Sequence, residues 1–397
     1  MNINRLNSLN KPDDLNLSAS SRNIVFINQA CGYITIDILN VFAQVFNRVA
    51  IIYGDIRIQE VPLDERIIRS KIIKKTRKSH LARLTRWIVA SIQTFALLLT
   101  KYRKFEIFYF SVPPFAYLSS LILRRRFSIL MWDVYPDALK GINVSEKHPV
   151  YQTWARLNRH LFGRAYRIYT IGDSLADQLA HYVVRKRIKV VPLWSGITIA
   201  ESVPRYENPF LKQHGIDGKF IVQYSGNLGS TYNMDIILQT AQITGNEKDI
   251  LYLIIGRGLN FEKVKKSIRE RNLTNCLPIE FLPDNMLKYS LAAADLGVVM
   301  IDEKFVNGSI PSKLYNLLAA GSPILSISAK GSELDRHVKK FRNGKNFENN
   351  DISGISKFII TAKNSPDLLS EFRNNSLIAA KNYSPQNANR FLANYLS

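Results

Sequence analysis

The sequence has few cysteines, few histidines and no long apolar segment. Its 397 residues include 2 cysteines and 6 histidines, and the histidines are scattered without the spacing of metal ligands. This composition excludes a disulfide framework and argues against a structural metal or a redox role. Residues 1–21, rich in Asn and Ser, lack the continuous apolar stretch of a signal peptide. We therefore expect a flexible N-terminal tail and a cytoplasmic protein.

Acidic residues are scarce in the first half of the chain. The formal net charge is +22; residues 1–200 hold 30 Lys and Arg against 13 Asp and Glu, whereas residues 201–397 hold 24 against 19. Between Glu65 and Glu106 there are twelve basic residues and no acidic one. This asymmetry predicts that the first half of the chain meets an anionic partner.

An apolar segment, WIVASIQTFALLL at residues 87–99, lies inside this basic run. It is too short to span a membrane. It is compatible with a helix on an anionic membrane surface or with a core helix that has a solvated basic face. A nucleic-acid surface fits less well, because the run lacks interleaved aromatic residues and Gly-rich loops. We expect residues 66–104 to contact an anionic membrane surface and no nucleic acid.

Short apolar runs alternate with helical periods along the whole chain, which is typical of parallel sheets flanked by helices. The first half contains NIVFIN, RVAIIYG, FEIFYF, FSILMWD, RIYTIG and IKVVPLW; the second contains KFIVQYSG, ILYLIIG, IEFLP, ADLGVVMI and PILSIS. The polar segment 195–218 is typical of a connection between domains. We expect Rossmann-like α/β domains over residues 22–200 and 201–380, and a C-terminal helix within residues 381–397 that can pack back on the first domain.

Ligands of open parallel sheets bind beyond the carboxyl ends of the strands. Four predicted strands end in Gly-rich or polar segments: YSGNLGSTYNMD, IIGRGLN, MWDVYPDAL and INQACGYIT. A single glycine after a strand usually marks only a turn, but the four segments together predict a ligand site.

The segment SIPSKLYNLLAAGSPIL, at residues 309–325, predicts a short helix from about residue 311 to residue 320. Lys313 falls in its first turn, where the helix dipole disfavours a cation. A phosphate at this helix end would resolve the conflict.

Taken together, these motifs resemble the retaining nucleotide-sugar glycosyltransferases of glycosyltransferase family 4. The resemblance rests on YSGNLGSTYNMD, LYLIIGRG, LAAADLGVVMI and PSKLYNLLAAGSPIL, and it covers nearly the whole chain from about residue 22. It implies the GT-B fold, in which two Rossmann-like doubly wound domains face each other across a cleft. MWDVYPDAL and IYTIGDSLADQL are similar to members that build bacterial surface polysaccharides.

The resemblance implies that the second domain binds a nucleotide diphosphate sugar as donor substrate, without a metal or another cofactor. Lys313 and Arg257 would stabilise the leaving diphosphate. Asp133 would orient the acceptor or the sugar, with helix capping as the alternative role. The donor would also contact Gly226, Asn227, Gly229, Ser230, Leu282, Ser309, Ser312 and Asn316. The acceptor side would include Gly32 and Tyr33.

The sequence departs from the family pattern at several positions. The usual pair of glutamates falls on Gly308 and Asn316, and Trp132 stands where a histidine often precedes the aspartate. We expect a retaining hexosyltransferase, peripheral on the inner face of the cell membrane, that extends a lipid-linked glycan acceptor. The alternatives are the same transferase acting on a protein or soluble acceptor, and a non-catalytic partner subunit.

Overall fold

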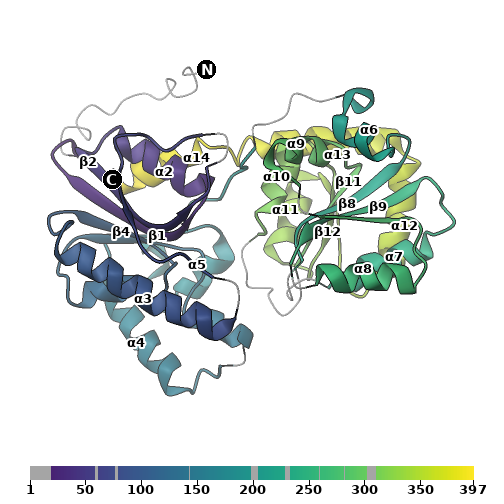
Figure 1. Ribbon diagram of the computed structural model, residues 1–397. Helices are drawn as coiled ribbons and strands as arrows, with labels where there is room; N and C mark the ends of the chain where they lie inside the picture. Colours follow the sequence, from purple (N-terminus) through teal and green to yellow (C-terminus); the bar gives the residue numbers. More distant parts are fainter. Residues whose placement is uncertain are drawn as a thin grey trace. The chain divides into compact units, whose positions relative to one another are not determined.

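The computed structural model describes residues 19–58, 61–76, 79–142, 144–197, 204–228, 233–258, 260–280, 282–301 and 310–397. They form two compact units (Figure 1). Unit 1 comprises the chain up to Thr170, together with Leu179–Val191 and Gln386–Ser397. Unit 2 comprises Ile171–Gln178 and Pro192–Pro385. Each unit is therefore built from more than one segment of the chain.

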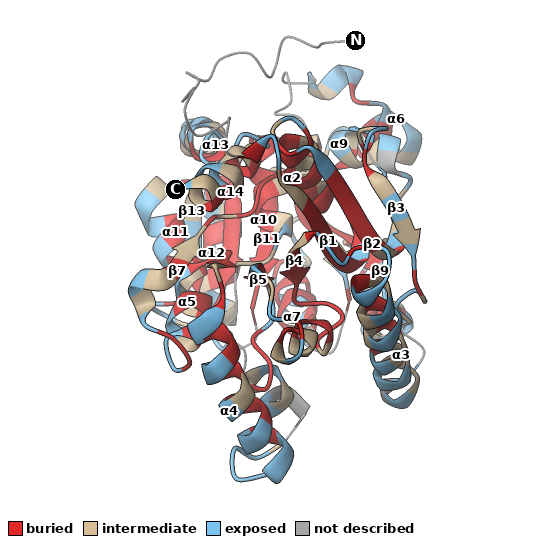
Figure 2. Cartoon of the chain, turned by 90° about the vertical axis from the view of Figure 1, so that its left-hand side faces the viewer, coloured by how far each residue is buried: buried red, intermediate tan, exposed pale blue. Residues whose placement is uncertain are grey.

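Unit 1 is built around a parallel sheet. Its seven strands among the described residues have the order β3-β2-β1-β4-β5-β6-β7, which reverses between β1 and β4. The strands are β1 (Asn23–Cys31), β2 (Arg48–Ile56), β3 (Ile68–Lys71), β4 (Glu106–Phe110), β5 (Phe127–Met131), β6 (Arg167–Thr170) and β7 (Ile188–Val190). The inner strands are buried on both faces, which explains why they are continuous apolar runs (Figure 2).

Helices cover both faces of this sheet. They are α2 (Tyr33–Ala43), α3 (His80–Leu99), α4 (Pro149–Arg164) and α14 (Asn387–Leu396), with short 3₁₀ segments η2 (Ala116–Leu121) and η3 (Asp137–Ile142). The short helix α5 (Asp173–Leu179) begins in the segment that belongs to unit 2.

The C-terminal helix α14 packs on unit 1, beside α2. Tyr395 is fully buried, and its hydroxyl donates to the Glu106 carboxylate at 2.6 Å. The same carboxylate pairs with Arg22 at 2.7 Å. The Tyr395 ring also meets the Phe42 ring edge-on at 5.5 Å. Residues from the two ends of the chain thus share one core.

Unit 2 contains a second parallel sheet, whose six strands among the described residues have the order β10-β9-β8-β11-β12-β13. They are β8 (Phe220–Asn227), β9 (Ile250–Arg257), β10 (Cys276–Glu280), β11 (Leu296–Met300), β12 (Ile324–Ile327) and β13 (Gly344–Phe347). The order reverses between β8 and β11, which is where ligands of such sheets bind. The helices are α6 (Pro209–His214), α7 (Asp235–Ile243), α8 (Phe261–Glu270), α9 (Asp284–Ala292), α10 (Lys313–Ala319), α11 (Glu333–Phe341), α12 (Ile352–Lys363) and α13 (Pro366–Ala380).

One glycine fixes how closely α10 approaches the sheet. A Cβ atom on Gly297, in the middle of β11, would lie 2.6 Å from the side chain of Leu317. Only glycine leaves room for α10 at this distance. The helix is shorter than the sequence predicts: it begins at Lys313, not at residue 311, because the residues before it form a turn in which the Leu314 amide donates to the Pro311 carbonyl.

Candidate functional site: the carboxyl edges of the two sheets

Lys313 and Gly226 lie beside each other at the switch point of the second sheet. Lys313 opens α10, and its Nζ lies 3.8 Å from the ring centroid of Tyr224 in β8. Gly226 has φ of +152°, and a Cβ atom there would lie 3.4 Å from both Cε and Nζ of Lys313. The structure therefore brings two predicted site residues together, and it adds Tyr224, which sequence reasoning missed although it stands two positions before Gly226.

The Lys313 ammonium group occupies a poorly hydrated position. The residue as a whole is partly exposed, but its Nζ atom is buried. Burial lowers the pKa of Lys313 from the ordinary 10.5 to about 7. A bound anion would favour the charged form, so this position suits a ligand that brings negative charge to the end of β8.

The ends of β8 and β9 are tied together by backbone hydrogen bonds. The Leu228 amide donates to the Arg257 carbonyl at 2.8 Å, and the Asn260 amide donates to the Leu228 carbonyl at 3.2 Å. Gly258 has φ of +135°, and a Cβ atom there would lie 2.9 Å from Oδ1 of Asn227. Asn227 and Arg257 are exposed at this edge, so their side chains can reach a ligand.

The remaining donor candidates divide into three groups. Ser312 is exposed, directly before α10. Leu282 is partly buried and packs against the apolar cluster that contains Phe210, so its side chain has a packing role and only its backbone is available to a ligand. The third group, which lies outside the described residues, consists of Gly229, Ser230 and Ser309. Gly308, where the family usually has a glutamate, lies outside them as well.

The Asn316 side chain binds residues 195 and 196, near the start of the main segment of unit 2. Its Oδ1 atom accepts from the Gly196 amide at 3.0 Å and from the Ser195 hydroxyl at 3.1 Å. Sequence reasoning missed this partnership, because Ser195 and Gly196 are far from Asn316 along the chain. Contact of Asn316 with a ribose stays a prediction, and any such contact would use the side-chain amide nitrogen as donor.

We expect Asn316→Ala to lower the free energy of unfolding by about 1 kcal/mol, because the Gly196 amide loses its acceptor. Asn316→Asp keeps an accepting oxygen at this position and serves as the matched control, with a smaller loss. Urea denaturation measures both. An Ala variant as stable as the wild type would contradict this structural role.

The first sheet presents its own row of candidates at its carboxyl edge. Gly32 and Tyr33 follow β1, and Gly32 caps α2 with open space where a Cβ atom would stand. Asp133 follows β5, and the preceding residue, Trp132, donates its amide to the hydroxyl of Ser111 after β4. Since β1, β4 and β5 are neighbours, Gly32, Tyr33 and Asp133 lie on one edge of unit 1. The donor candidates belong to unit 2.

Part of the Asp133 side chain is exposed to solvent, but neighbouring protein atoms reduce the hydration of its carboxyl group. Desolvation raises the pKa of its carboxyl group above the ordinary aspartate value, and the positive charge of Lys75 partly offsets the rise. Two residues later, Tyr135 is buried, and its ring stacks on Trp154 at 5.4 Å. The 3₁₀ segment η3 begins only at Asp137.

The helix α3 contains the apolar segment of the basic run. Its inner side packs in the core through Trp87, Ala90 and Leu98. Its outer side is apolar as well, and it exposes Leu81, Leu84, Ile88, Ile92 and Leu99. The helix is thus a core helix whose exposed face is apolar rather than purely basic. Among the described residues, no helix is both long enough and apolar enough to cross a membrane.

Two parallel, doubly wound sheets in one chain define a protein of the GT-B fold class. Residues 207–377, which make up most of unit 2, match the family described as glycosyl transferases group 1. This part of the chain is therefore similar to the glycosyl transferases of group 1, in agreement with the resemblance seen in the sequence.

Two relatives to which the chain is similar are also named as glycosyltransferases. The chain is 29% identical to the probable glycosyltransferase WbjE of Pseudomonas aeruginosa over 58% of each chain. It is 23% identical to the putative colanic acid biosynthesis glycosyl transferase WcaI of Escherichia coli (strain K12) over 53% of each chain. The match thus spans a little over half the length of these relatives.

The fold is similar to that of Anabaena Alr3699/HepE, solved in complex with UDP, with a TM-score of 0.69, 13% identity, and coverage of 94% of this chain and 99% of that one. It is also similar to WaaG, a glycosyltransferase involved in lipopolysaccharide biosynthesis, with a TM-score of 0.66, 13% identity and the same coverage. The GT-B fold predicted from the sequence is therefore confirmed.

Proposed function

We propose that the protein is a retaining hexosyltransferase that moves a sugar from a UDP-sugar to a lipid-linked glycan acceptor at the inner surface of the cell membrane. The observation that carries the donor part is the buried Lys313 ammonium group beside Gly226 at the switch point of the second sheet. The similar HepE structures hold UDP and UDP-glucose, which supports UDP as the nucleotide. The WbjE relative supports glycosyl transfer, and the WcaI relative, named for colanic acid biosynthesis, supports a role in bacterial surface polysaccharide synthesis.

In this proposal, the chemistry depends on stabilising the leaving diphosphate. Lys313 supplies a positive charge from a poorly hydrated position, where its interaction with phosphate oxygens is strong. Arg257, exposed at the end of β9, supplies a second cation. The departing diphosphate takes the proton of the acceptor hydroxyl, so no enzyme carboxylate acts as nucleophile. Asp133 orients the acceptor on unit 1.

The acceptor part rests on the surface of unit 1. Between Glu65 and Asp133 the sequence contains one acidic residue, Glu106. Its carboxylate is engaged by Arg22 and Tyr395. The exposed face of α3 is apolar and lies within this basic region. A basic surface with exposed apolar side chains favours an anionic membrane, and therefore an acceptor that resides there.

A non-catalytic partner subunit is the second candidate. It is favoured by Asn316, which stands where the family usually has a glutamate and whose side-chain oxygen already accepts two hydrogen bonds from within unit 2.

Thermal unfolding with added nucleotides separates the two candidates. We expect UDP at a hundred times its dissociation constant to add about 2.7 kcal/mol to the free energy of unfolding. GDP serves as the control nucleotide and should give a smaller shift. UDP release from UDP-glucose in the presence of membrane lipid then tests turnover. No shift with either nucleotide would overturn the donor proposal and favour the non-catalytic subunit.

A further inference from the structure

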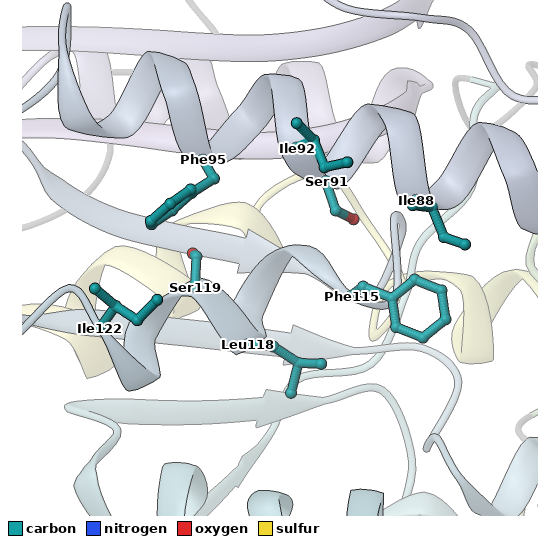
Figure 3. A pocket seen from close by; sticks show the side chains of 8 residues that line it. All are labelled: Ile88, Ser91, Ile92, Phe95, Phe115, Leu118, Ser119 and Ile122. Carbon is teal, nitrogen blue, oxygen red and sulfur yellow. The ribbon is translucent and has the colours of Figure 1, made fainter. Parts of the chain in front are cut away.

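Unit 1 has an open apolar groove between α3 and η2. Its volume is about 470 Å³, within the range of roughly 300–1,000 Å³ typical of small-molecule sites. Six of its eight lining residues are apolar and two are serines (Figure 3). The lining consists of Ile88, Ser91, Ile92, Phe95, Phe115, Leu118, Ser119 and Ile122.

The isoleucine side chains that line the groove are largely exposed to solvent. Ile92 on α3 is 64% exposed, and Ile122, just after η2, is 69% exposed. Ile88, one turn before Ile92, is also exposed and continues the outer apolar face of α3. Contiguous apolar surface of this kind marks a binding site for an apolar partner.

One end of the groove is connected through packed aromatic rings to the neighbourhood of Asp133. Figure 3 shows Phe115 at one end of the groove and Phe95 with Ile122 at the other. The Phe115 ring packs on Trp154 with centroids 4.9 Å apart, and Trp154 stacks on Tyr135. Tyr135 follows Asp133 by two residues. The Phe115 end is therefore linked by a continuous row of aromatic rings to the edge where we place the acceptor.

Positive charge gathers at this same end. The Arg83 guanidinium lies over the Trp87 ring at 5.2 Å, and Trp87 meets Tyr135 edge-on at 5.9 Å. Lys75 is near enough to Asp133 for its charge to act on that carboxyl group. An apolar groove with cations at one end is complementary to a hydrocarbon chain that ends in a phosphate.

We propose that the groove between α3 and η2 holds the hydrocarbon chain of the acceptor, a long-chain lipid phosphate. Its phosphate lies by Lys75 and Arg83, and its glycan extends toward Asp133. The assignment of this lipid as the acceptor rests on the proposed function. Binding of the hydrocarbon chain in the groove would position the acceptor lipid relative to the carboxyl edge of the unit 1 sheet. This role is distinct from attachment of the protein to the bilayer.

Binding of monomeric farnesyl diphosphate, followed by calorimetry below its micelle concentration, tests the groove. We expect Ile92→Glu and Ile122→Glu each to weaken binding about tenfold or more, because a carboxylate then stands in the apolar lining. Leu81→Glu is the matched control: Leu81 is 75% exposed on the same helix but does not line the groove. Its affinity should stay close to that of the wild type. Pyrophosphate alone and farnesol alone should each bind more weakly than the joined molecule.

The proposal is overturned if monomeric farnesyl diphosphate does not bind, or if Leu81→Glu weakens binding as much as Ile92→Glu does. Equal weakening in the two variants would indicate a general membrane-contacting surface instead of a lipid-binding groove. The UDP-induced thermal shift is measured on the same samples. A normal shift in Ile92→Glu shows that the variant is folded. A wild type that binds farnesyl diphosphate but not UDP would overturn the donor proposal and leave the groove supported.

Discussion

Lys313→Met is expected to remove UDP-induced stabilisation and to lower the rate of sugar transfer by about a hundredfold or more. The ammonium group is buried beside Gly226 and over Tyr224, where its charge meets a diphosphate with little competition from water. Methionine has a similar length and no charge, so the cavity stays filled. Thermal unfolding with UDP and the rate of UDP release measure the two effects.

The same substitution has a pH-dependent effect on the free protein. Burial lowers the folded-state pKa of Lys313 from 10.5 to about 7. The penalty of the buried charge is therefore complete below pH 7, shrinks as the pH rises, and vanishes above about pH 10.5. We expect Lys313→Met to be more stable than the unliganded wild type by up to a few kcal/mol at pH 7, with a smaller advantage at pH 9.

UDP binding should also take up a proton at pH 8, because the anion restores the charged lysine. Calorimetry in buffers of different ionisation enthalpy detects this uptake. Lys313→Arg is the control: arginine stays charged, so this variant should retain some UDP affinity without proton uptake. Unchanged UDP affinity in Lys313→Met would remove Lys313 from the donor site.

The architecture could be predicted from the sequence because parallel strands buried on both faces leave continuous apolar runs. Each of the eleven runs noted in the sequence overlaps a strand of the two sheets, although IEFLP shares only residues 279 and 280 with β10. Two strands were missed. The segments IRSK of β3 and GKNF of β13 are short and partly exposed at the sheet edges. Their extended form comes from pairing with β2 and β12, which no local pattern records.

The candidate site was predicted only in part, because its decisive contacts are long-range. The first-turn position of Lys313 indicated an anion, but its burial over Tyr224 depends on how closely α10 approaches β11 at Gly297. The partners of Asn316 stand 120 and 121 positions away. The apolar periodicity of the last helix predicted a helix but not its packing partner. In the structure, Tyr395 of this helix donates a hydrogen bond to Glu106 of unit 1.

Asp133→Asn is expected to lower kcat for sugar transfer by about a hundredfold while UDP binding stays unchanged. Asp133 lies on unit 1, and the donor candidates lie on unit 2, so the two effects are separable. UDP release, measured with an acceptor that supports wild-type turnover, gives kcat, and the UDP-induced thermal shift reports the donor site.

Stability distinguishes an acceptor-orienting Asp133 from a structural one. Desolvation raises the folded-state pKa of this carboxyl group, so its ionisation destabilises the folded protein as the pH rises through the aspartate range. Asp133→Asn should therefore be at least as stable as the wild type at pH 7. It should also remove the acidic limb of the rate profile, which the raised pKa of Asp133 shifts toward higher pH. A variant that keeps kcat but loses stability would show that Asp133 acts as a helix cap. A variant with a lower kcat and a higher stability would show that the carboxylate destabilises the folded protein and acts on the acceptor.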